Sequence, residues 1–574
     1  MPGIASSLRL SILGAMPSAP EPSASHAPSR DQQSRLYLRR SPWVWIAFAL
    51  LAVVILKSAW LSEDSYISFR AIDHFVGGHG LNWNVSERVQ VYTNPLWVLI
   101  ISAFYFFTGE FVVTLTILAW LVSLGAAVLA LTRLAATLPA LLAGVVILIA
   151  SRAWIDYSTS GLENPMTFLM LAAFLVTGLA GSFHPRRLPW LILFGSLCAL
   201  NRLDTVLLTG PLILYAFWQT IRSPERPSWL KLFGQMALAS FPLWGWLLFS
   251  TVYYGFPLPN TYYAKLTTGI PKPEYYQQGF YYYANTLRTD AVTLLVIGVG
   301  LIAVVVRREW SACMAALGVM LYLAYIISVG GDFMRGRFFA APLFVITILI
   351  VRFPMSNKQW LGAGAVVVIL GLIQPQPALF YHPWQGVDWA KVDAAEDLEE
   401  ILATLDANHG IADERAFAYQ STGLLPLLLK GRIQPRHPFI GKGRSLAASD
   451  DPVAVFGNTG FAGFYAGSNV HIIDDMGLCD ALIARLPVAP EVLEDWRVGH
   501  YRRDVPTGYV TTVRTGRNQL TDPRVSNLYE SLDQIIAGPI WSPERWREIW
   551  RWNSGHYQSI LDDLQSNPPQ PATS

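Results

Sequence analysis

Charged side chains are scarce in this sequence. Asp, Glu, Lys and Arg make up 14% of its 574 residues, whereas hydrophobic residues make up 52%. Soluble globular domains carry about 25% charged residues. The deficit argues against an ordinary soluble protein and indicates that lipid surrounds much of the chain. The formal net charge of +2 also lacks the basic excess typical of nucleic-acid binding, so we expect no nucleic-acid partner.

Cysteine and the common cofactor motifs are missing or rare as well. The three cysteines, Cys198, Cys313 and Cys479, are too few and too scattered for a disulfide framework or a zinc site. No Walker motif, dinucleotide-binding fingerprint or metalloprotease helix occurs. A soluble nucleotide donor is therefore not expected. A lipid-linked donor, with its tail in the bilayer, fits the composition better.

Long apolar runs are what the sequence has in abundance. Many approach the ~20 residues that a membrane-spanning helix needs. They lie near residues 43–61, 111–131, 136–150, 165–181, 188–200, 205–221, 231–250, 290–306, 311–329, 338–352 and 359–374. A short run at 95–107 is interpreted as a re-entrant or interfacial helix, because the basic loops then all face the cytoplasm. We expect an α-helical polytopic membrane protein with about 11–13 transmembrane helices.

The two ends of the chain differ from this membrane domain, which we assign to residues 42–375. Residues 1–41 are rich in Ser, Pro and Ala and are predicted to be a disordered cytoplasmic tail. Arg35, Arg39 and Arg40 precede the first apolar run, so its basic flank is expected inside.

The C-terminal part mixes polar residues with short apolar runs. The runs at 453–456 and 470–473 are bounded by turn residues and predict strands. Residues 393–405 have helical spacing. We expect residues 376–565 to form a soluble α/β or α+β domain outside the cytoplasm, followed by a loose tail at 566–574.

The predicted outer loops hold the chemistry-bearing residues. Glu63 and Asp64 directly follow the first span, where a carboxylate can act as a general base or hold a metal. The alternative is that the pair only ends the helix. Arg202 and Asp204 occupy a very short loop, as a structural ion pair or with Arg202 on a phosphate.

Further motifs complete these loops. A Tyr-rich loop contains Tyr263 and Lys265, and its tyrosines suit either sugar rings or an interfacial aromatic belt. In another loop Arg335 and Arg337 stand beside Asp332, a combination that can bind an anion.

Together the motifs resemble the GT-C superfamily of polyprenyl-phosphate-sugar glycosyltransferases, and most closely the mycobacterial terminal β-(1→2)-arabinofuranosyltransferase family. The matching stretches lie at residues 63–68, 78–81, 92–97, 159–163, 201–204, 259–265, 330–338 and 473–480. The chain departs from the family in having Glu63 where Asp is usual and Cys479 where Thr is usual. Neither change removes a carboxylate.

The resemblance implies an inverting glycosyltransferase of the inner membrane, with its N-terminus cytoplasmic and its C-terminal domain periplasmic. It would move an arabinofuranose-like sugar from a polyprenyl-phosphate donor to a glycan, glycolipid or protein acceptor. Asp64 would be the general base, assisted by Glu63, and no cofactor beyond a divalent cation is implied. The implied phosphate-binding residues are Arg202, Lys265, Arg335 and Arg337, and the implied sugar- or acceptor-pocket residues are Glu163, Asp204, Tyr263, Asp332 and Asp475.

Two other functional classes remain open from the sequence. A lipid-linked sugar transporter is one, although transporters usually place polar groups near the middle of the bilayer, and here they lie at the ends of the spans. A non-catalytic envelope or flagellar-motor assembly factor on the same scaffold is the other.

Overall fold

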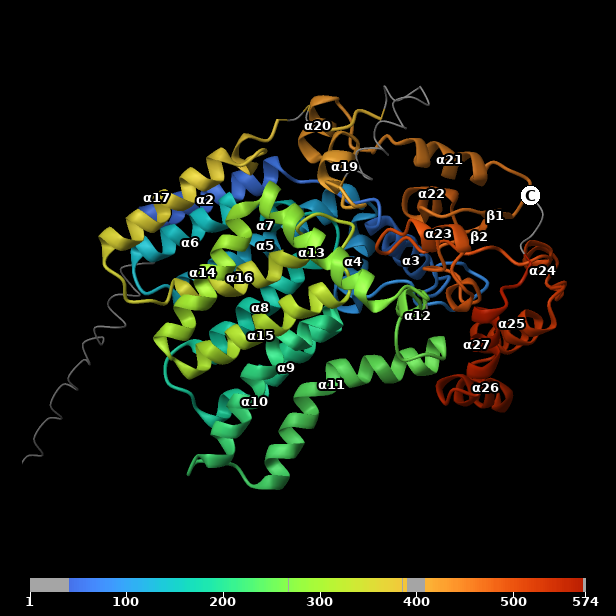
Figure 1. Ribbon diagram of the computed structural model, residues 1–574, viewed down its shortest axis with the longest axis horizontal. Coiled ribbons are helices and arrows are strands. Elements are labelled where there is room, and N and C mark those ends of the chain that lie inside the picture. The colour runs from blue at the N-terminus through green and yellow to red at the C-terminus, as the bar shows by residue number, and fades with distance from the viewer. Residues whose placement is uncertain (1–40, 267, 383, 385, 390–407, 571–574) are drawn as a thin grey trace, which may run out of the picture.

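The structure is a computed structural model, and it describes residues 41–570 except 267, 383, 385 and 390–407. The predicted helix at 393–405 therefore lies outside the described residues. The predicted tail at 1–41 also lies outside them, except for Ser41. The described chain is mostly helical. A bundle of apolar helices forms one side of the molecule, and the C-terminal region packs at one end of it (Figure 1).

Every long apolar run of the sequence is a helix in the bundle. The bounds of the bundle helices and of the short helices between them are α2 Pro42–Lys57, α3 Ser65–Val76, α4 Pro95–Thr108, α5 Val112–Leu134, α6 Leu138–Ala150, α7 Arg152–Asp156, α8 Asn164–Leu179, η1 Pro185–Arg187, α9 Leu188–Asn201, η2 Leu203–Thr205, α10 Val206–Arg222, α11 Trp229–Tyr254, α12 Asn260–Leu266, α13 Lys272–Thr289, α14 Ala291–Arg307, α15 Trp310–Ser328, η3 Arg337–Phe339, α16 Ala340–Ile350 and α17 Asn357–Ile373. The prediction of a mostly helical protein is confirmed.

Length and composition divide these helices into three groups. Helices α5, α11 and α15 are long and apolar enough to cross a membrane alone. Helices α13 and α14 pass the same test only together and are bent by 108° at their junction. Shorter apolar helices such as α2, α6 and α17 accompany them. The larger span count predicted from the sequence stays a prediction.

Local sequence explains several helix boundaries. Pro42 and Pro95 stand in the first turn of α2 and α4, where a missing N–H costs nothing. The Glu110 carboxylate accepts hydrogen bonds from the N–H groups of Val112 and Val113 at the start of α5. Ser356 begins α17 with a capping box.

The C-terminal region is also mainly helical. Its elements are η4 Ala378–Phe380, α19 Glu414–Thr422, α20 Leu424–Leu429, α21 Pro438–Ala447, β1 Val453–Val455, α22 Thr459–Ala466, β2 His471–Ile473, η5 Ile483–Arg485, α23 Pro490–Glu494, α24 Tyr509–Thr515, α25 Pro523–Ile536, α26 Pro543–Asn553 and α27 Gln558–Ser566. The two predicted strands are confirmed: β1 and β2 pair in parallel, with Val453 opposite His471. They form the only sheet among the described residues.

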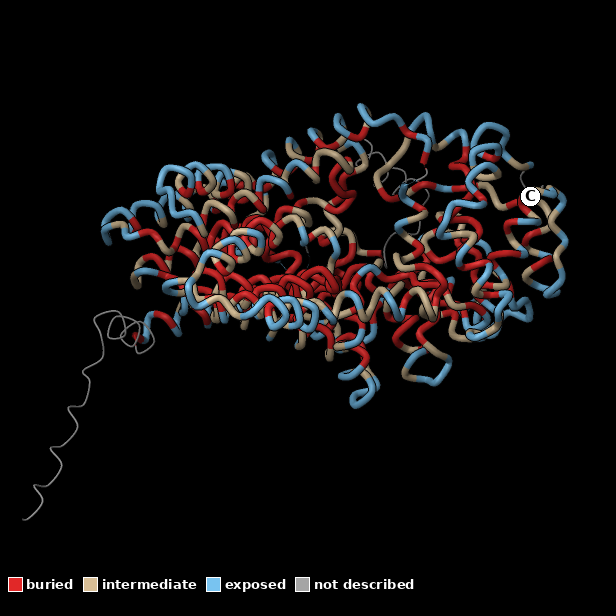
Figure 2. Tube along the Cα trace, turned by 90° about the horizontal axis from the view of Figure 1, so that it is seen from below, coloured by how far each residue is buried: buried red, intermediate tan, exposed pale blue. Residues whose placement is uncertain are grey.

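The C-terminal region shares a hydrophobic core with the first loop of the bundle. Buried Tyr66 and Trp83 of that loop belong to the same core as Phe461, Ile472 and Leu528. A second core fills the centre of the bundle, and buried segments run through both parts of the molecule (Figure 2). The division into a membrane domain and a soluble domain thus remains a prediction, whereas the packing between the two parts is extensive.

Candidate active site

The acidic pair lies in the tight turn between α2 and α3. The Ser62 N–H donates to the Ser160 carbonyl at 2.8 Å, which joins this turn to the 159–163 motif. The next glycine, Gly161, lies so close that an added Cβ would approach the Ser65 side chain to 2.8 Å. The motifs that resemble the arabinofuranosyltransferase family therefore meet around the pair, although they are far apart in sequence.

Glu63 is held by the C-terminal region. Its carboxylate accepts a 2.8 Å hydrogen bond from the Phe461 N–H in the first turn of α22. A Cβ at Gly460 would lie 2.6 Å from that carboxylate, so the contact needs glycine there. Burial and the neighbouring Asp64 raise the pKa of Glu63 to about 8. This carboxyl thus connects α22 to the turn that carries Asp64.

Asp64 has a different environment. It is the N-cap residue of α3, yet its carboxylate caps no backbone N–H. Burial raises its pKa, while Arg337 and Lys265 act in the opposite direction. Asp64 is therefore half-buried, Arg337 and Lys265 are its main cationic neighbours, and the described residues do not use its carboxylate for helix capping.

Two of the predicted arginines are already paired with carboxylates. Glu163 lies 2.6 Å from Arg202 and 3.1 Å from Arg337. Burial would raise the pKa of Glu163, but these two guanidinium groups outweigh burial and lower it to about 2. Arg202 also binds Asp204 at 2.8 Å, and Arg337 lies 3.3 Å from Asp332. The ion pair that the sequence offered for Arg202 and Asp204 is present.

Lys265 is the exception among the predicted phosphate-binding cations. It lies on α12, the residue as a whole is exposed although its ammonium group is surrounded by protein, and no hydrogen bond or ion pair connects it to the described residues. Burial lowers its pKa, whereas the nearby Asp332 and Asp64 raise it. Its ammonium group thus stands close to Asp64 and has a free hydrogen-bonding capacity among the described residues.

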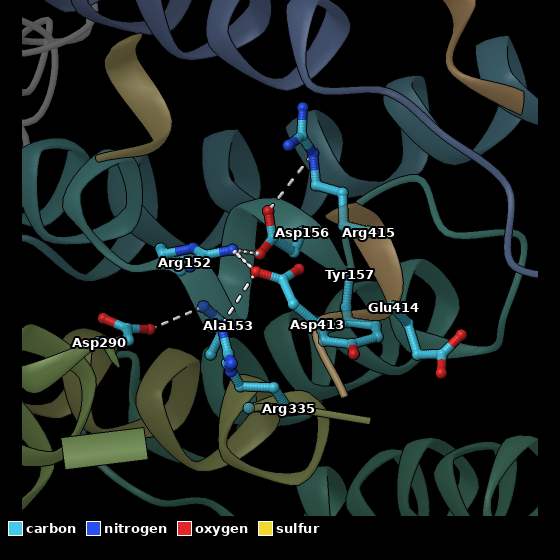
Figure 3. A pocket seen from close by; sticks show the side chains of 10 residues that line it. Arg152, Ala153, Asp156, Tyr157, Asp290, Arg335, Asp413, Glu414 and Arg415 are labelled. Carbon is cyan, nitrogen blue, oxygen red and sulfur yellow. Dashed lines mark hydrogen bonds and ion pairs between the residues drawn. The ribbon is translucent and has the colours of Figure 1, made fainter. Parts of the chain in front are cut away.

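Arg335 lies in a neighbouring network rather than in the group around Asp64. Its guanidinium contacts Asp413 at 3.0 Å, and Arg152 contacts the same carboxylate oxygen at 2.7 Å. Arg152 also pairs with Asp156, which lies 3.7 Å from Arg415. We call these five residues the Asp413 network; they line a pocket with room for about one water molecule (Figure 3).

Glu414 joins the two groups. Asp413 caps α19 by accepting from the Ala416 N–H at 3.0 Å, and Glu414 is the next residue. In Figure 3 its side chain points away from Arg152 and Asp156. Burial raises the pKa of Glu414 to about 8, Arg497 at 3.7 Å opposes this, and Asp64 reinforces it. Glu414 therefore belongs to the surroundings of Asp64.

Sequence reasoning missed Asp413, Glu414, Arg415 and Arg497. The acidic-basic run at 413–415 was the available signal, but it lies far from the loops in which we expected the site. Among the other predicted residues, Tyr263 packs its ring 4.6 Å from Arg485, and Asp475 lies 3.4 Å from Arg502. Neither is among the main electrostatic neighbours of Asp64.

The described residues contain no group of three or more His, Cys, Asp and Glu side chains placed to hold a metal ion. Around Asp64 the described side chains offer a half-buried carboxylate, a lysine that pairs with none of the described residues, and arginines that are paired with carboxylates. Such an arrangement suits proton abstraction next to a bound anion.

The chain is similar to known proteins over most of its length. No protein-family model matches the chain. It is 25% identical to the terminal β-(1→2)-arabinofuranosyltransferase of Mycobacterium tuberculosis, over 81% of this chain and 84% of that protein. It is 24% identical to the protein of the same name from Corynebacterium glutamicum, over 77% of this chain and 72% of that protein.

These similarities confirm the resemblance seen in the motifs, and the chain is a membrane glycosyltransferase. Among solved structures it is similar to ArnT from Cupriavidus metallidurans. The form bound to undecaprenyl phosphate matches with a TM-score of 0.47 and 14% identity, over 75% of this chain and 85% of ArnT. The apo form matches with the same TM-score and 16% identity, over 76% and 86% of the two chains.

Proposed function

We propose that the protein is an inverting glycosyltransferase of the bacterial inner membrane that uses a polyprenyl-phosphate-linked sugar, arabinofuranose-like in kind. The names of the two curated relatives support the sugar. The acceptor is a glycan, glycolipid or protein outside the cytoplasm. The N-terminus lies in the cytoplasm, and residues 376–565 form the periplasmic part.

The environment of Asp64 carries the proposal. A general base must be near the acceptor hydroxyl and must not be consumed by structural hydrogen bonds. Asp64 caps no helix, and its main electrostatic neighbours include Arg337 and Lys265. Its raised pKa makes the carboxylate a stronger base than an exposed aspartate.

The reaction is a single displacement. The acceptor oxygen forms a bond to the anomeric carbon while the bond from that carbon to the phosphate oxygen breaks. The acceptor proton moves to Asp64, and the electron pair leaves with the polyprenyl phosphate. Attack from the face opposite the phosphate inverts the configuration.

Lys265 is the cation best placed to receive the growing phosphate charge. Arg202 and Arg337 are already paired with carboxylates. Their role is therefore to fix the geometry of the site and to add to its positive electrostatic potential. Removing one electrostatic contact to a developing charge typically costs ~10²–10³ in rate. Glu414, at the start of α19, is assigned to the acceptor side because the C-terminal region contributes it.

The test uses purified protein in proteoliposomes with synthetic polyprenyl-phosphoryl donors that carry arabinofuranose, ribofuranose or mannose. Transfer of arabinofuranose to an arabinan oligosaccharide, with the inverted anomer in the product, is expected. The Asp64→Asn variant should bind donor and transfer almost nothing. Rapid transbilayer movement of the donor without any transfer would show a transporter instead, and full activity of Asp64→Asn would remove the proposed base.

A further inference from the structure

Helix α26 is attached to the end of a membrane-spanning helix. The Arg545 guanidinium donates hydrogen bonds to the carbonyls of Val252 at 2.8 Å and Tyr253 at 2.9 Å. Asn553 donates to the Gly255 carbonyl at 3.0 Å. These carbonyls belong to the last turn and the C-cap of α11, which is long and apolar enough to span. Helix α26 is therefore fixed to the C-terminal end of α11.

Helix α26 and the residues just before it carry exposed tryptophans. Trp541 and Trp550 are each 75% exposed, and Trp546 stacks against Trp541 with ring centroids 6.3 Å apart. Tryptophan is highly buried on average in soluble folds, but it is enriched where a membrane protein meets the lipid headgroups. Exposed Arg547 on the same helix adds a positive charge suited to lipid phosphates.

A second attachment of the same kind lies at the end of α2. The Tyr419 hydroxyl donates to the Lys57 carbonyl at 2.6 Å, and the Leu424 N–H donates to the Ala59 carbonyl at 3.0 Å. These contacts fix α20 just beyond α2. Leu428 and Leu429 of α20 are exposed, as is Ile433 shortly after it.

We propose that the C-terminal region rests on the adjacent lipid leaflet through these two surfaces. The tryptophan surface consists of Trp541, Trp546 and Trp550, and the leucine surface of Leu428, Leu429 and Ile433. The helices that carry them, α26 and α20, lie at opposite edges of the molecule in Figure 1. Contact at both edges holds the C-terminal region at a fixed height above the bilayer.

Continuity with the lipid-facing surface of α11 favours lipid as the occupant. Trp244 and Leu248 of α11 are more than half exposed, and they lead along the helix toward the α26 attachment. Exposed tryptophans also suit a sugar chain, but stacking of Trp546 on Trp541 covers part of that platform. The leucine surface consists of aliphatic side chains, which offer a sugar neither an aromatic ring nor a hydrogen-bonding group.

The experiment places one fluorescent label at each surface. Trp550→Cys and Leu428→Cys are made in a Cys313→Ala background, since Cys198 and Cys479 are buried, and are labelled with NBD. Asp450→Cys, an exposed position between α21 and β1, is the matched control. The proteins are studied in phosphatidylcholine nanodiscs with and without lipids that carry a nitroxide near the headgroup.

We expect the labels at 550 and 428 to lose most of their emission in the nitroxide nanodiscs, whereas the label at 450 keeps its emission. Equal emission at all three positions overturns the proposal, and so does quenching at only one of the two surfaces. A label at 550 that is unquenched but responds to an added arabinan oligosaccharide overturns it in favour of a glycan platform.

Discussion

The group around Asp64 and the Asp413 network are two buried clusters of charge, both built where the helix bundle meets the C-terminal region. In the Asp413 network each carboxylate has at least one arginine partner, and Asp413 has two, at 2.7 and 3.0 Å. Around Asp64, Lys265 has no ion pair among the described residues and Asp64 caps no helix. The carboxylates of the Asp413 network are thus all paired, whereas the group around Asp64 keeps a lysine without an ion pair among the described residues and is available to a ligand.

The difference assigns separate tasks to the two clusters. Burying a charge is costly unless it is paired, so complete pairing indicates a structural role. Charges kept buried without full pairing are typical of functional sites. The Asp413 network also fixes the start of α19, and thereby the position of Glu414 beside the Asp64 group. The structural cluster thus positions one side of the functional one.

The largest expected effect separates the two members of the acidic pair. Asp64→Asn should lower the transfer rate by ~10²–10⁴, the usual contribution of a general base. Glu63→Gln should have a much smaller effect, because a glutamine oxygen can still accept from the Phe461 N–H. Initial rates in proteoliposomes measure both. Equal losses for the two variants would contradict the assignment. The wild-type rate should also fall as the pH drops through the raised pKa of Asp64.

Breaking the Asp413 network should cost stability first. Arg152→Met leaves two buried carboxylates with one partner fewer each, and loss of a buried partner costs ~3–5 kcal/mol. The matched control is Arg514→Met, which breaks the exposed 2.6 Å pair with Asp451 and should cost far less stability, because water screens an exposed pair. Denaturant unfolding in detergent compares the two. A similar stability for both variants would show that the network is dispensable.

Lys265→Met tests whether the unpaired cation receives the phosphate. The transfer rate should fall by ~10²–10³, with the folded protein about as stable as the wild type, because Lys265 makes no ion pair with the described residues that the substitution would break. Lys272→Met is the control, since Lys272 is exposed and lies over the Tyr275 ring instead. The kcat and the KM for the donor are measured for both. Unchanged kinetics in Lys265→Met would show that Lys265 does not bind the phosphate and would leave Arg202 and Arg337 as the candidates.

The smallest effect concerns the pH dependence of stability. Burial raises the folded-state pKa of Glu414 to about 8, well above that of an unfolded glutamate. The folded protein therefore holds a proton that the unfolded chain has lost, and stability falls by about 1.4 kcal/mol per pH unit as the pH rises between the two values. Glu414→Gln should lack this part of the slope. If the free energy of unfolding changed with pH equally in the variant and the wild type between pH 6 and 8, Glu414 would have an ordinary, solvent-exposed pKa and the prediction would be wrong.

Much of the fold was predictable because hydrophobicity is a local signal. Each apolar run became a helix, and the two short runs after residue 450 became β1 and β2. The C-terminal region proved more helical than the alternation of its short runs indicated. Its packing with residues 61–83 was not predictable, because the shared core joins segments about 400 residues apart in the sequence.

The sequence by itself determined that the protein is a membrane glycosyltransferase and that Glu63 and Asp64 follow its first apolar run. Composition and motif order are properties of the chain and need no folding to be seen. Only the tertiary structure decided that Glu63 contacts α22, that Arg335 pairs with Asp413, and that Lys265, an electrostatic neighbour of Asp64, pairs with none of the described residues. Partners of a charge are chosen by distance in space, and those distances arise only when the bundle and the C-terminal region pack together.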